Sequence, residues 1–431
     1  MPKPGRTSAG CSMAAVFATC RLPRKTRNRA VAHRLDRRQI SSINAGMAVT
    51  SIPRRLEPPR QSFFLFGPRG TGKSRWLGER FPHAAATFDL LDEAVRVELL
   101  ADPAAFAHKL EGLRAGSWVV VDEVQRAPVL LNTVHRFIEK RRLRFVLCGS
   151  SARQLRRRGV NLLAGRAVER RLHPFTASEL GERFHLEEAL SVGTLPLVWS
   201  ADDRAESLRA YVQTYLAQEI QAEAAVRGLP SFVRFLPVAA LFQGQVLSVS
   251  ALARDSGVPR STLQAYLEIL DQTLLTFRLE AYRPRLRVKE VAHPKLYWAD
   301  AGLVRAFKRN LGPVHEEERG ALFEGWVAQS LRAMNDYVGL FDDWHYWSSH
   351  GSRGTVEVDF LLRQGKRFVA IEAKAARRFK PEMLKGLQAI NELPGVARRL
   401  LVHGGADSWR TDDRIEVMSA GRFTSEIERG L

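Results

Sequence analysis

The sequence predicts an α/β fold that begins with a parallel sheet covered by helices. Three apolar runs, at residues 63–66, 118–121 and 145–148, are typical of strands that are buried on both faces. Residues 87–90 indicate a further strand, and residues 93–113 indicate helices between these strands. Because strands and helices alternate along the chain, we expect a parallel sheet with right-handed crossovers.

The first apolar run leads into a segment that is typical of a phosphate-binding loop. Its spacing is G-x-x-x-x-G-K-S, and a helix-compatible segment follows from Arg75. Glycines allow the backbone to approach closely, and backbone N–H groups at a helix N-terminus favour a polyphosphate. Lys73 would contact the terminal phosphates, and Ser74 would bind Mg²⁺. The predicted nucleotide-binding residues are Gly67, Pro68, Arg69, Gly70, Thr71, Gly72, Lys73 and Ser74.

Two carboxylates, Asp122 and Glu123, follow the second apolar run at its C-terminal end. Open α/β sheets place their ligand crevice at that end of their strands. We therefore predict that Asp122 helps to hold Mg²⁺ and that Glu123 is the general base which orients the attacking water. For either carboxylate alone, an acidic strand end that faces solvent is the alternative.

Two further positions fit the same site. Gly149, Ser150 and Ser151 follow the third apolar run, so Ser150 or Ser151 would sense the γ-phosphate; the pattern does not choose between them. Arg166 would supply a transition-state cation, either within its own chain or to a neighbouring subunit. The alternative for Arg166 is an ordinary surface arginine.

With these motifs in view, the chain resembles the AAA-type P-loop ATPases (AAA+ superfamily) whose C-terminal half is the domain of unknown function 4143. The resemblance covers roughly residues 55–405. It implies ATP and Mg²⁺ as cofactors, the sheet order 5-1-4-3-2, and helical, winged-helix and nuclease-like parts after the ATPase core. The matching segments are G-P-R-G-T-G-K-S, V-V-V-D-E-V-Q, G-S-S-A-R, L-L-A-G-R-A, L-H-P-F-T-A-S-E-L, residues 211–220, residues 295–303 and residues 356–374.

The length of 431 residues predicts two or three domains. An apolar fraction of 45% with 26% charged residues is typical of a globular protein. We expect an ATPase core at 55–180, a helical and winged-helix-like region at 181–290, a restriction-endonuclease-like domain at 291–410 and a tail at 411–431. The net charge of +20 favours an anionic partner such as nucleic acid, although an arginine-rich composition also follows from a GC-rich genome.

Three cysteines offer no disulfide framework or metal spacing, which suits a reducing cytoplasm. No apolar run approaches the roughly 18 residues of a membrane span, so we expect a soluble, cytoplasmic protein with no membrane partner.

Residues 1–46 carry ten Lys and Arg against one acidic residue and indicate a disordered extension. A signal core and a transit peptide are alternatives for this segment. We favour an untranslated extension upstream of a start at Met47.

A helix-turn-helix pattern lies in the middle region. Residues 248–253 and 261–267 frame Gly257-Val258-Pro259, and the second segment opens with Ser and Thr. Basic side chains beside it would contact phosphates: Arg254, Arg260, Arg283, Arg285, Arg287 and Lys289. The alternative is a module that only docks other proteins.

A third group of chemical residues lies near the C-terminus. Residues 356–362 and 368–374 predict a β-hairpin, in which Glu372 and Lys374 share one face of the second strand. If Asp359 points the same way, two carboxylates would hold Mg²⁺ while Lys374 orients or deprotonates a water. The spacing D-x12-E-x-K resembles the restriction-endonuclease-like fold, with Glu324 as a further metal ligand. The alternative is a half-buried hairpin whose charged side chains face solvent, because it has the same sequence pattern.

Asp300 precedes a glycine-containing segment and is expected to cap the helix that follows it.

Three functional hypotheses remain. The first, which we favour, is a Mg²⁺-dependent ATPase coupled to a nucleic-acid-directed nuclease-like module. The second is an ATP-dependent regulatory switch, in which ATP changes the domain arrangement and the C-terminal module only binds a partner. The third is a winged-helix DNA-binding regulator whose ATP site sets assembly, for instance of a homo-oligomer.

Overall fold

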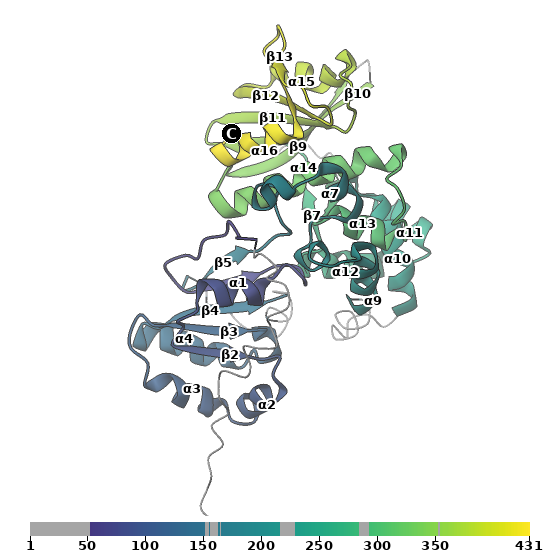
Figure 1. The fold of residues 1–431 in the computed structure, drawn as a ribbon. Helices are drawn as coiled ribbons and strands as arrows, with labels where there is room; N and C mark the ends of the chain where they lie inside the picture. The colour runs from purple at the N-terminus through teal and green to yellow at the C-terminus, as the bar shows by residue number, and fades with distance from the viewer. Residues whose placement is uncertain are drawn as a thin grey trace, which may run out of the picture. The chain divides into compact units, whose positions relative to one another are not determined.

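The computed structural model describes residues 52–150, 155, 163, 165–215, 229–283, 293–351 and 354–431. The basic N-terminal extension, Ser151 and three of the predicted phosphate-contacting residues (Arg285, Arg287 and Lys289) lie outside these ranges. The described part is a mixed α/β structure with a parallel sheet in its N-terminal region and further α/β regions after it (Figure 1).

Five parallel strands form the first sheet, in the order β2-β3-β4-β1-β5. This confirms the expected order 5-1-4-3-2. The strands are β1 (Phe63–Phe66), β2 (Ala86–Asp89), β3 (Trp118–Asp122), β4 (Arg144–Gly149) and β5 (Val168–Arg171).

Helices cover both faces of this sheet, as Figure 1 shows. Because successive side chains of a strand point to opposite faces, Phe63 and Leu65 of β1 pack towards α1, whereas Phe64 and Phe66 pack towards α2, α3 and α4. This explains why β1, β3 and β4 are continuous apolar runs. The helices are α1 (Lys73–Arg80), α2 (Glu93–Ala101), α3 (Pro103–Glu111) and α4 (Leu130–Arg141), and a 3₁₀ turn, η1 (Val124–Arg126), follows β3.

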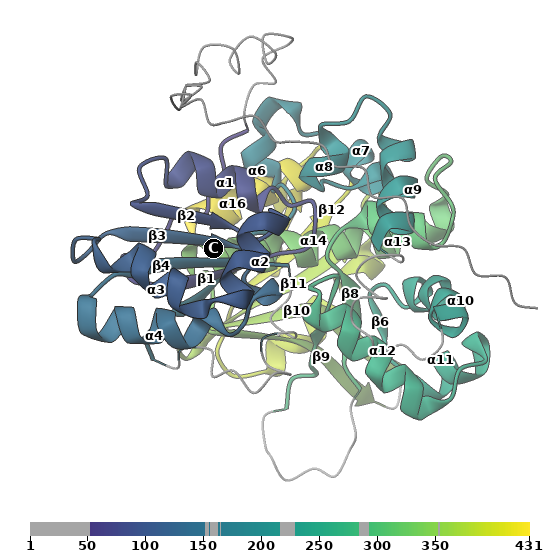
Figure 2. The ribbon, with the colours of Figure 1, turned by 90° about the horizontal axis from the view of Figure 1, so that it is seen from below.

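A helical region with a small antiparallel sheet follows. The sheet has the order β6-β8-β7, and Figure 2 shows α10, α11 and α12 grouped around β6 and β8. The elements are α6 (Ala177–Leu180), η2 (Gly181–Arg183), α7 (Leu186–Val192), α8 (Pro196–Trp199), α9 (Arg204–Tyr215), α10 (Leu229–Leu241), β6 (Gln245–Val246), α11 (Val249–Ser256), α12 (Arg260–Gln272), β7 (Thr276–Leu279), β8 (Lys295–Trp298) and α13 (Ala301–Phe307).

The two helices of the predicted helix-turn-helix are present as α11 and α12. Ser248 caps α11 by accepting a hydrogen bond from Ala251 N at 3.2 Å, and Gly257 ends the helix at a φ of 64°, which glycine adopts without strain. The domain boundary that the sequence suggested near residue 290 falls inside this region. The reason is that β8 pairs with both β6 and β7, which lie on the other side of that boundary in the chain.

The C-terminal region is built on a six-stranded mixed sheet in the order β13-β14-β12-β11-β10-β9. Its α14 and α16 pack on one face, and α15 packs on the other. The elements are α14 (Glu316–Val338), β9 (Asp343–Gly351), β10 (Gly354–Gln364), β11 (Arg367–Lys374), η4 (Pro381–Leu384), α15 (Lys385–Ala389), η5 (Ile390–Glu392), β12 (Val396–His403), β13 (Trp409–Arg410), β14 (Glu416–Ser419) and α16 (Ala420–Arg429).

The predicted hairpin is confirmed, because β10 and β11 pair antiparallel with Leu361 opposite Ala370. A two-residue turn at Gly365 and Lys366 joins the strands, and Gly365 has the positive φ, 61°, that such a turn requires. Residues 411–431 differ from the expected tail. They supply β14, which pairs with β12, and α16, whose Phe423 and Ile427 are buried in the core.

Among the described residues, no helix is long and apolar enough to cross a membrane.

Two helical glycines provide a matched test of the packing. A Cβ at Gly302 in α13 would lie 2.1 Å from the backbone oxygen of Val192, whereas a Cβ at Gly320 in α14 would have no neighbour within 4 Å. We expect Gly302→Ala to lower the free energy of unfolding by about 3 kcal/mol, since backbone must move. Gly320→Ala should raise it by about 1 kcal/mol through helix propensity. Urea denaturation measures both, and similar changes in the two variants would contradict the close approach of α13 to Val192.

Candidate nucleotide site and C-terminal carboxylate cluster

The phosphate loop lies between β1 and α1. Lys73 is buried, and its Nζ donates hydrogen bonds to Gly67 O at 2.8 Å and to Pro68 O at 3.1 Å. Gly70 and Gly72 have φ values of 81° and 82°, in the region that favours glycine. The first N–H groups of a helix have no intrahelical partner, and Gly72, which precedes α1, supplies no side chain to cap them. Together with the helix dipole, this arrangement favours an anion at the loop.

A hydroxyl and a carboxylate meet beside this loop. Ser74 Oγ donates to Asp122 Oδ2 at 2.6 Å, and Asp122 Oδ1 accepts from Glu123 N at 2.9 Å. Both are oxygen donors of the kind that Mg²⁺ takes together with nucleotide phosphates. The residues present therefore fit a Mg²⁺–nucleotide, in which Ser74 and Asp122 would hold the Mg²⁺.

Glu123 has an unusual backbone conformation for a residue other than glycine, with φ 54° and ψ 43°. Such conformations are costly and gather at functional sites. Its carboxylate accepts a hydrogen bond from Gln125 Nε2, which also donates to Ser150 Oγ at 3.3 Å. Gln125 thus joins the predicted base to the predicted sensor.

Gln125 was not among the predicted site residues. It is buried, and its Oε1 has no hydrogen-bond partner. A Cβ at Gly149 would lie 2.3 Å from this oxygen, so the amide needs a glycine beside it. The only signal in the sequence was its position two residues after Glu123 in the V-V-V-D-E-V-Q segment.

Arg166 does not lie at this site in its own chain. It precedes β5, whose Val168 pairs with Phe63 at the start of β1, while the phosphate loop follows the end of β1. The arginine is therefore at the opposite edge of the sheet, where its guanidinium pairs with Glu139. Arg69 is exposed on the loop itself.

A buried arginine that the sequence did not single out supports the loop from outside. Arg54 donates to Thr71 O at 2.7 Å, to His173 O at 2.5 Å and to Glu179 Oε1 at 3.0 Å. It also contacts the Tyr337 hydroxyl in α14 at 3.3 Å. Its position in a Pro- and Arg-rich stretch carries no periodic signal, and its partners are distant in the chain.

A second support comes from the segment formed by residues 194–199, which includes α8. Leu197 N donates to Gly70 O in the phosphate loop at 3.0 Å. Asp300 holds the start of this segment, because its Oδ2 accepts from Thr194 N at 2.6 Å. The predicted helix cap is also confirmed, since Asp300 Oδ1 accepts from Leu303 N at 3.2 Å. Burial raises the pKa of Asp300 to about 6, against the opposing effect of these N–H groups.

In the C-terminal region the structure brings the four predicted residues together. Glu372 forms an ion pair with Lys374, whose Nζ lies 3.9 Å from Asp359 Oδ2. Asp359 Oδ2 also accepts from Ala373 N at 3.0 Å, which holds the carboxylate against β11. Glu324 reaches the same place from α14, which passes beside β11 and β8 (Figure 2).

A fifth residue, Lys295 of β8, lies among these carboxylates and was not predicted. Its Nζ is 3.1 Å from Glu324 Oε1 and 3.2 Å from Asp359 Oδ1, and it also pairs with Glu357. The Tyr297 hydroxyl donates to Glu324 Oε1 at 2.6 Å. The only sequence signal was the alternation of Lys295 and Tyr297 on one face of a short strand.

The donor set of this carboxylate cluster (Glu324, Glu357, Asp359 and Glu372) does not fit the predicted Mg²⁺. Lys295 already occupies the oxygens that a metal would need, and the described residues contain no group of three or more His, Cys, Asp or Glu side chains suited to a metal ion. Burial and the charge of Asp359 raise the pKa of Glu324 to about 7 and that of Glu372 to about 8. The same negative charges outweigh burial and raise the pKa of Lys295 above its usual value.

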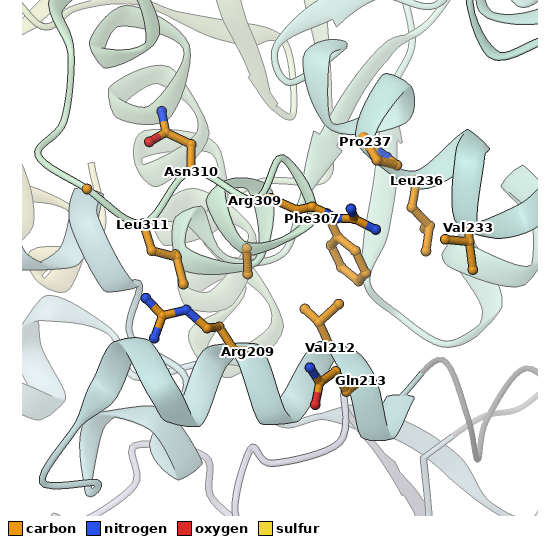
Figure 3. A pocket seen from close by; sticks show the side chains of 12 residues that line it. Arg209, Val212, Gln213, Val233, Leu236, Pro237, Phe307, Arg309, Asn310 and Leu311 are labelled. Carbon is orange, nitrogen blue, oxygen red and sulfur yellow. The ribbon is translucent and has the colours of Figure 1, made fainter.

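A pocket of about 650 Å³ lies away from both groups, between α9, α10 and α13 (Figure 3). Val212, Leu236 and Phe307 give it apolar walls, and Arg209 and Arg309 bring positive charge. No predicted site residue lines it.

Three family models match consecutive parts of the chain. Residues 59–181 match an AAA domain, residues 183–313 match a domain of unknown function (8612), and residues 319–423 match the domain of unknown function 4143. Uncharacterized proteins of Mycobacterium bovis and Mycobacterium tuberculosis are each 26% identical over 376 residues, which is 83% of this chain and 80% of theirs.

Two solved structures are also similar in part. A RuvB mutant of Thermotoga maritima is 18% identical and covers 51% of this chain and 82% of its own, with a TM-score of 0.26. A Vibrio cholerae protein is 13% identical and covers 73% of this chain and 91% of its own, with a TM-score of 0.22. The AAA match coincides with the five-stranded parallel sheet and its phosphate loop.

The raised pKa of Asp300 predicts a specific pH dependence of stability. Between its unfolded value of 3.8 and about 6, the native state keeps a proton that the unfolded chain releases, so this group's contribution to stability falls as the pH rises. We expect the free energy of unfolding of the wild type to fall by about 3 kcal/mol more than that of Asp300→Asn between pH 4 and 7. Denaturant titrations at several pH values measure this difference.

Asp92→Asn, at the exposed cap of α2, is the control and should keep the wild-type slope. An equal slope in wild type and Asp300→Asn would show that Asp300 does not titrate in this window.

Proposed function

We propose that this protein binds ATP and hydrolyses it with Mg²⁺. The observation that carries the proposal is the meeting, at one edge of the parallel sheet, of the Lys73 loop with the Ser74–Asp122 hydrogen bond and with Glu123. No other part of the described chain combines a phosphate loop with a hydroxyl and a carboxylate. The match of residues 59–181 to an AAA domain supports it.

The proposed roles follow from the geometry. The loop N–H groups and Lys73 would bind the phosphates. To do so, the Lys73 ammonium would exchange its hydrogen bonds to Gly67 O and Pro68 O for contacts with phosphate oxygens. Mg²⁺, held through Ser74 and Asp122, would neutralise charge on the phosphate oxygens. Glu123 would accept a proton from the attacking water. The hydrogen bond from Gln125 would orient the Glu123 carboxylate. Ser150, whose Oγ accepts from the same Gln125 nitrogen, would contact the γ-phosphate.

Arg166 fits the proposal only if it acts on a neighbouring copy. It lies at the edge of the sheet opposite the phosphate loop, so a cation for the transition state would reach the next chain of a homo-oligomer.

We further propose nucleic acid as a partner of the middle region. The order α10, β6, α11, α12, β7, β8 resembles that of a winged helix, which supports this proposal, and Arg254 and Arg260 are exposed beside the turn between α11 and α12. The net charge of +20 supports contacts with a phosphate backbone. Docking of a protein partner remains the alternative for this surface.

For the C-terminal region, two hypotheses were open: a module that cleaves nucleic acid, and one that does not cleave. The position of Lys295 among Glu324, Glu357 and Asp359 favours the second. We therefore propose an ATP-dependent switch in which ATP binding and turnover govern a non-cleaving C-terminal module.

Removal of the loop lysine tests nucleotide binding. We expect Lys73→Ala to weaken ATP binding by at least about 100-fold, because a buried, charge-assisted contact to the phosphates is lost. Isothermal titration calorimetry with Mg²⁺–ATP measures this change. Lys109→Ala, an exposed lysine of α3 that pairs with Glu98, is the matched control and should bind as the wild type does. Wild-type affinity in Lys73→Ala would overturn the assignment of the loop.

Removal of the base separates binding from turnover. We expect Glu123→Gln to keep ATP affinity within a few-fold and to lower kcat by roughly 10² to 10⁴, the usual contribution of a general base. Steady-state phosphate release measures kcat, and calorimetry measures affinity. Glu111→Gln, at the exposed end of α3, is the control. Normal turnover by Glu123→Gln would assign the base elsewhere.

A further inference from the structure

Lys295 is enclosed in the carboxylate cluster by both its backbone and its side chain. Its strand, β8, is paired on both sides, with β6 and with β7. Only 4% of the side chain is exposed, and the ammonium also lies 5.7 Å from the centre of the Tyr346 ring. The lysine therefore cannot move into solvent without breaking the small sheet or its own contacts.

The ammonium contacts three carboxylates that arrive from two different elements. Glu324 comes from α14, whereas Glu357 and Asp359 come from β10. Burying carboxylates together is costly unless a cation compensates their charge. Lys295 provides that cation, and a divalent metal within bonding distance of the same oxygens would have to displace it.

One oxygen of the cluster is left without a partner. Glu372 is 6% exposed and its Oε1 pairs with Lys374, but its Oε2 is buried and has no hydrogen-bond partner. Glu372 is adjacent to Lys374, whose ammonium also approaches Asp359. The cluster thus has more carboxylate oxygens than its two lysines satisfy.

We infer that Lys295 is the resident cation of the carboxylate cluster, that the native chain holds no divalent metal there, and that removing this ammonium turns the cluster into a divalent-cation site. Without Lys295, the oxygens of Glu324 and Asp359 that it now contacts become available together with Glu372 Oε2. Carboxylate oxygens are the ligands that Mg²⁺ and Mn²⁺ prefer. The inference concerns only Lys295 and the carboxylate cluster, and it stands whether or not the chain hydrolyses ATP.

Titration of the nucleotide-free full chain with Mn²⁺, followed by electron paramagnetic resonance, tests the inference. We expect Lys295→Met to bind one Mn²⁺ per chain at least 10-fold more tightly than the wild type, and Lys295→Met combined with Asp359→Asn to lose that site. Lys295→Arg keeps the positive charge and is the matched control; it should bind no more Mn²⁺ than the wild type.

Two results would overturn the inference. The first is Mn²⁺ binding by the wild type that Asp359→Asn abolishes, because the native cluster would then hold a metal beside Lys295. The second is the absence of an added Mn²⁺ site in a folded Lys295→Met variant. Lys295→Gln is the second neutral variant if Lys295→Met does not fold, and circular dichroism establishes folding before each titration.

Cleavage assays give an independent readout on the wild type. Incubation of DNA and RNA with Mg²⁺ or Mn²⁺, with and without ATP, should produce no cleavage that depends on Lys374. Cleavage that Lys374→Ala removes, while ATP turnover is unchanged, would contradict the inference and leave the proposed ATPase intact. The absence of ATP turnover in the wild type, together with no cleavage that depends on Lys374, would contradict the proposed ATPase and leave the inference intact.

Discussion

The register of the parallel sheet is the constraint on which the nucleotide site depends. Phe66 at the end of β1 lies opposite Gly149 at the end of β4, and β3 pairs with β4 in the same direction. The residues that follow these strands therefore meet at one edge, although they are separated by up to about eighty positions in the chain. Any slip of a strand would move Asp122 or Ser150 away from the loop, because side chains alternate between faces.

The phosphate loop is supported by parts of the chain outside the AAA match. Arg54 precedes β1 and bonds Thr71 O, while Leu197 of α8 bonds Gly70 O and Asp300 holds the segment before it. Helix α14 takes part in both groups of functional residues, since Tyr337 contacts Arg54 and Glu324 lies in the carboxylate cluster. These two residues are thirteen positions apart on one continuous helix, a separation of about 20 Å. A rigid element therefore joins the two places.

The two acidic sites differ in where their lysine lies. At the nucleotide site, Lys73 donates to backbone carbonyls of its own loop. The Asp122 carboxylate therefore accepts its hydrogen bond from the Ser74 hydroxyl and not from a lysine. In the cluster, Lys295 lies directly between carboxylates. Similar residue types thus leave a carboxylate and a hydroxyl for Mg²⁺ in one case and carboxylates bound to a lysine in the other. The difference is decided by the position of one ammonium.

The sequence by itself determined the features that depend on neighbours in the chain. Continuous apolar runs, alternating side chains, the spacing of glycines and a polar residue before a helix are local patterns. They predicted four strands of the parallel sheet, the phosphate loop, the β10–β11 hairpin and the Asp300 cap, whereas the order of the sheet followed only from the family resemblance. They placed Glu372 and Lys374 on one face, and the resemblance to a restriction-endonuclease-like fold added Asp359 and Glu324, which the structure brings to the same place.

Only the tertiary structure decided which distant side chains complete these sites. Arg54, Gln125 and Lys295 act through partners that the folding of other elements brings to them, and Arg166 lies at the wrong edge of the sheet for its own loop. The sequence cannot distinguish a buried lysine from an exposed one in a chain with 66 Lys and Arg. Burial depends on how helices and sheets pack, and packing sums many weak contacts between residues far apart in the chain.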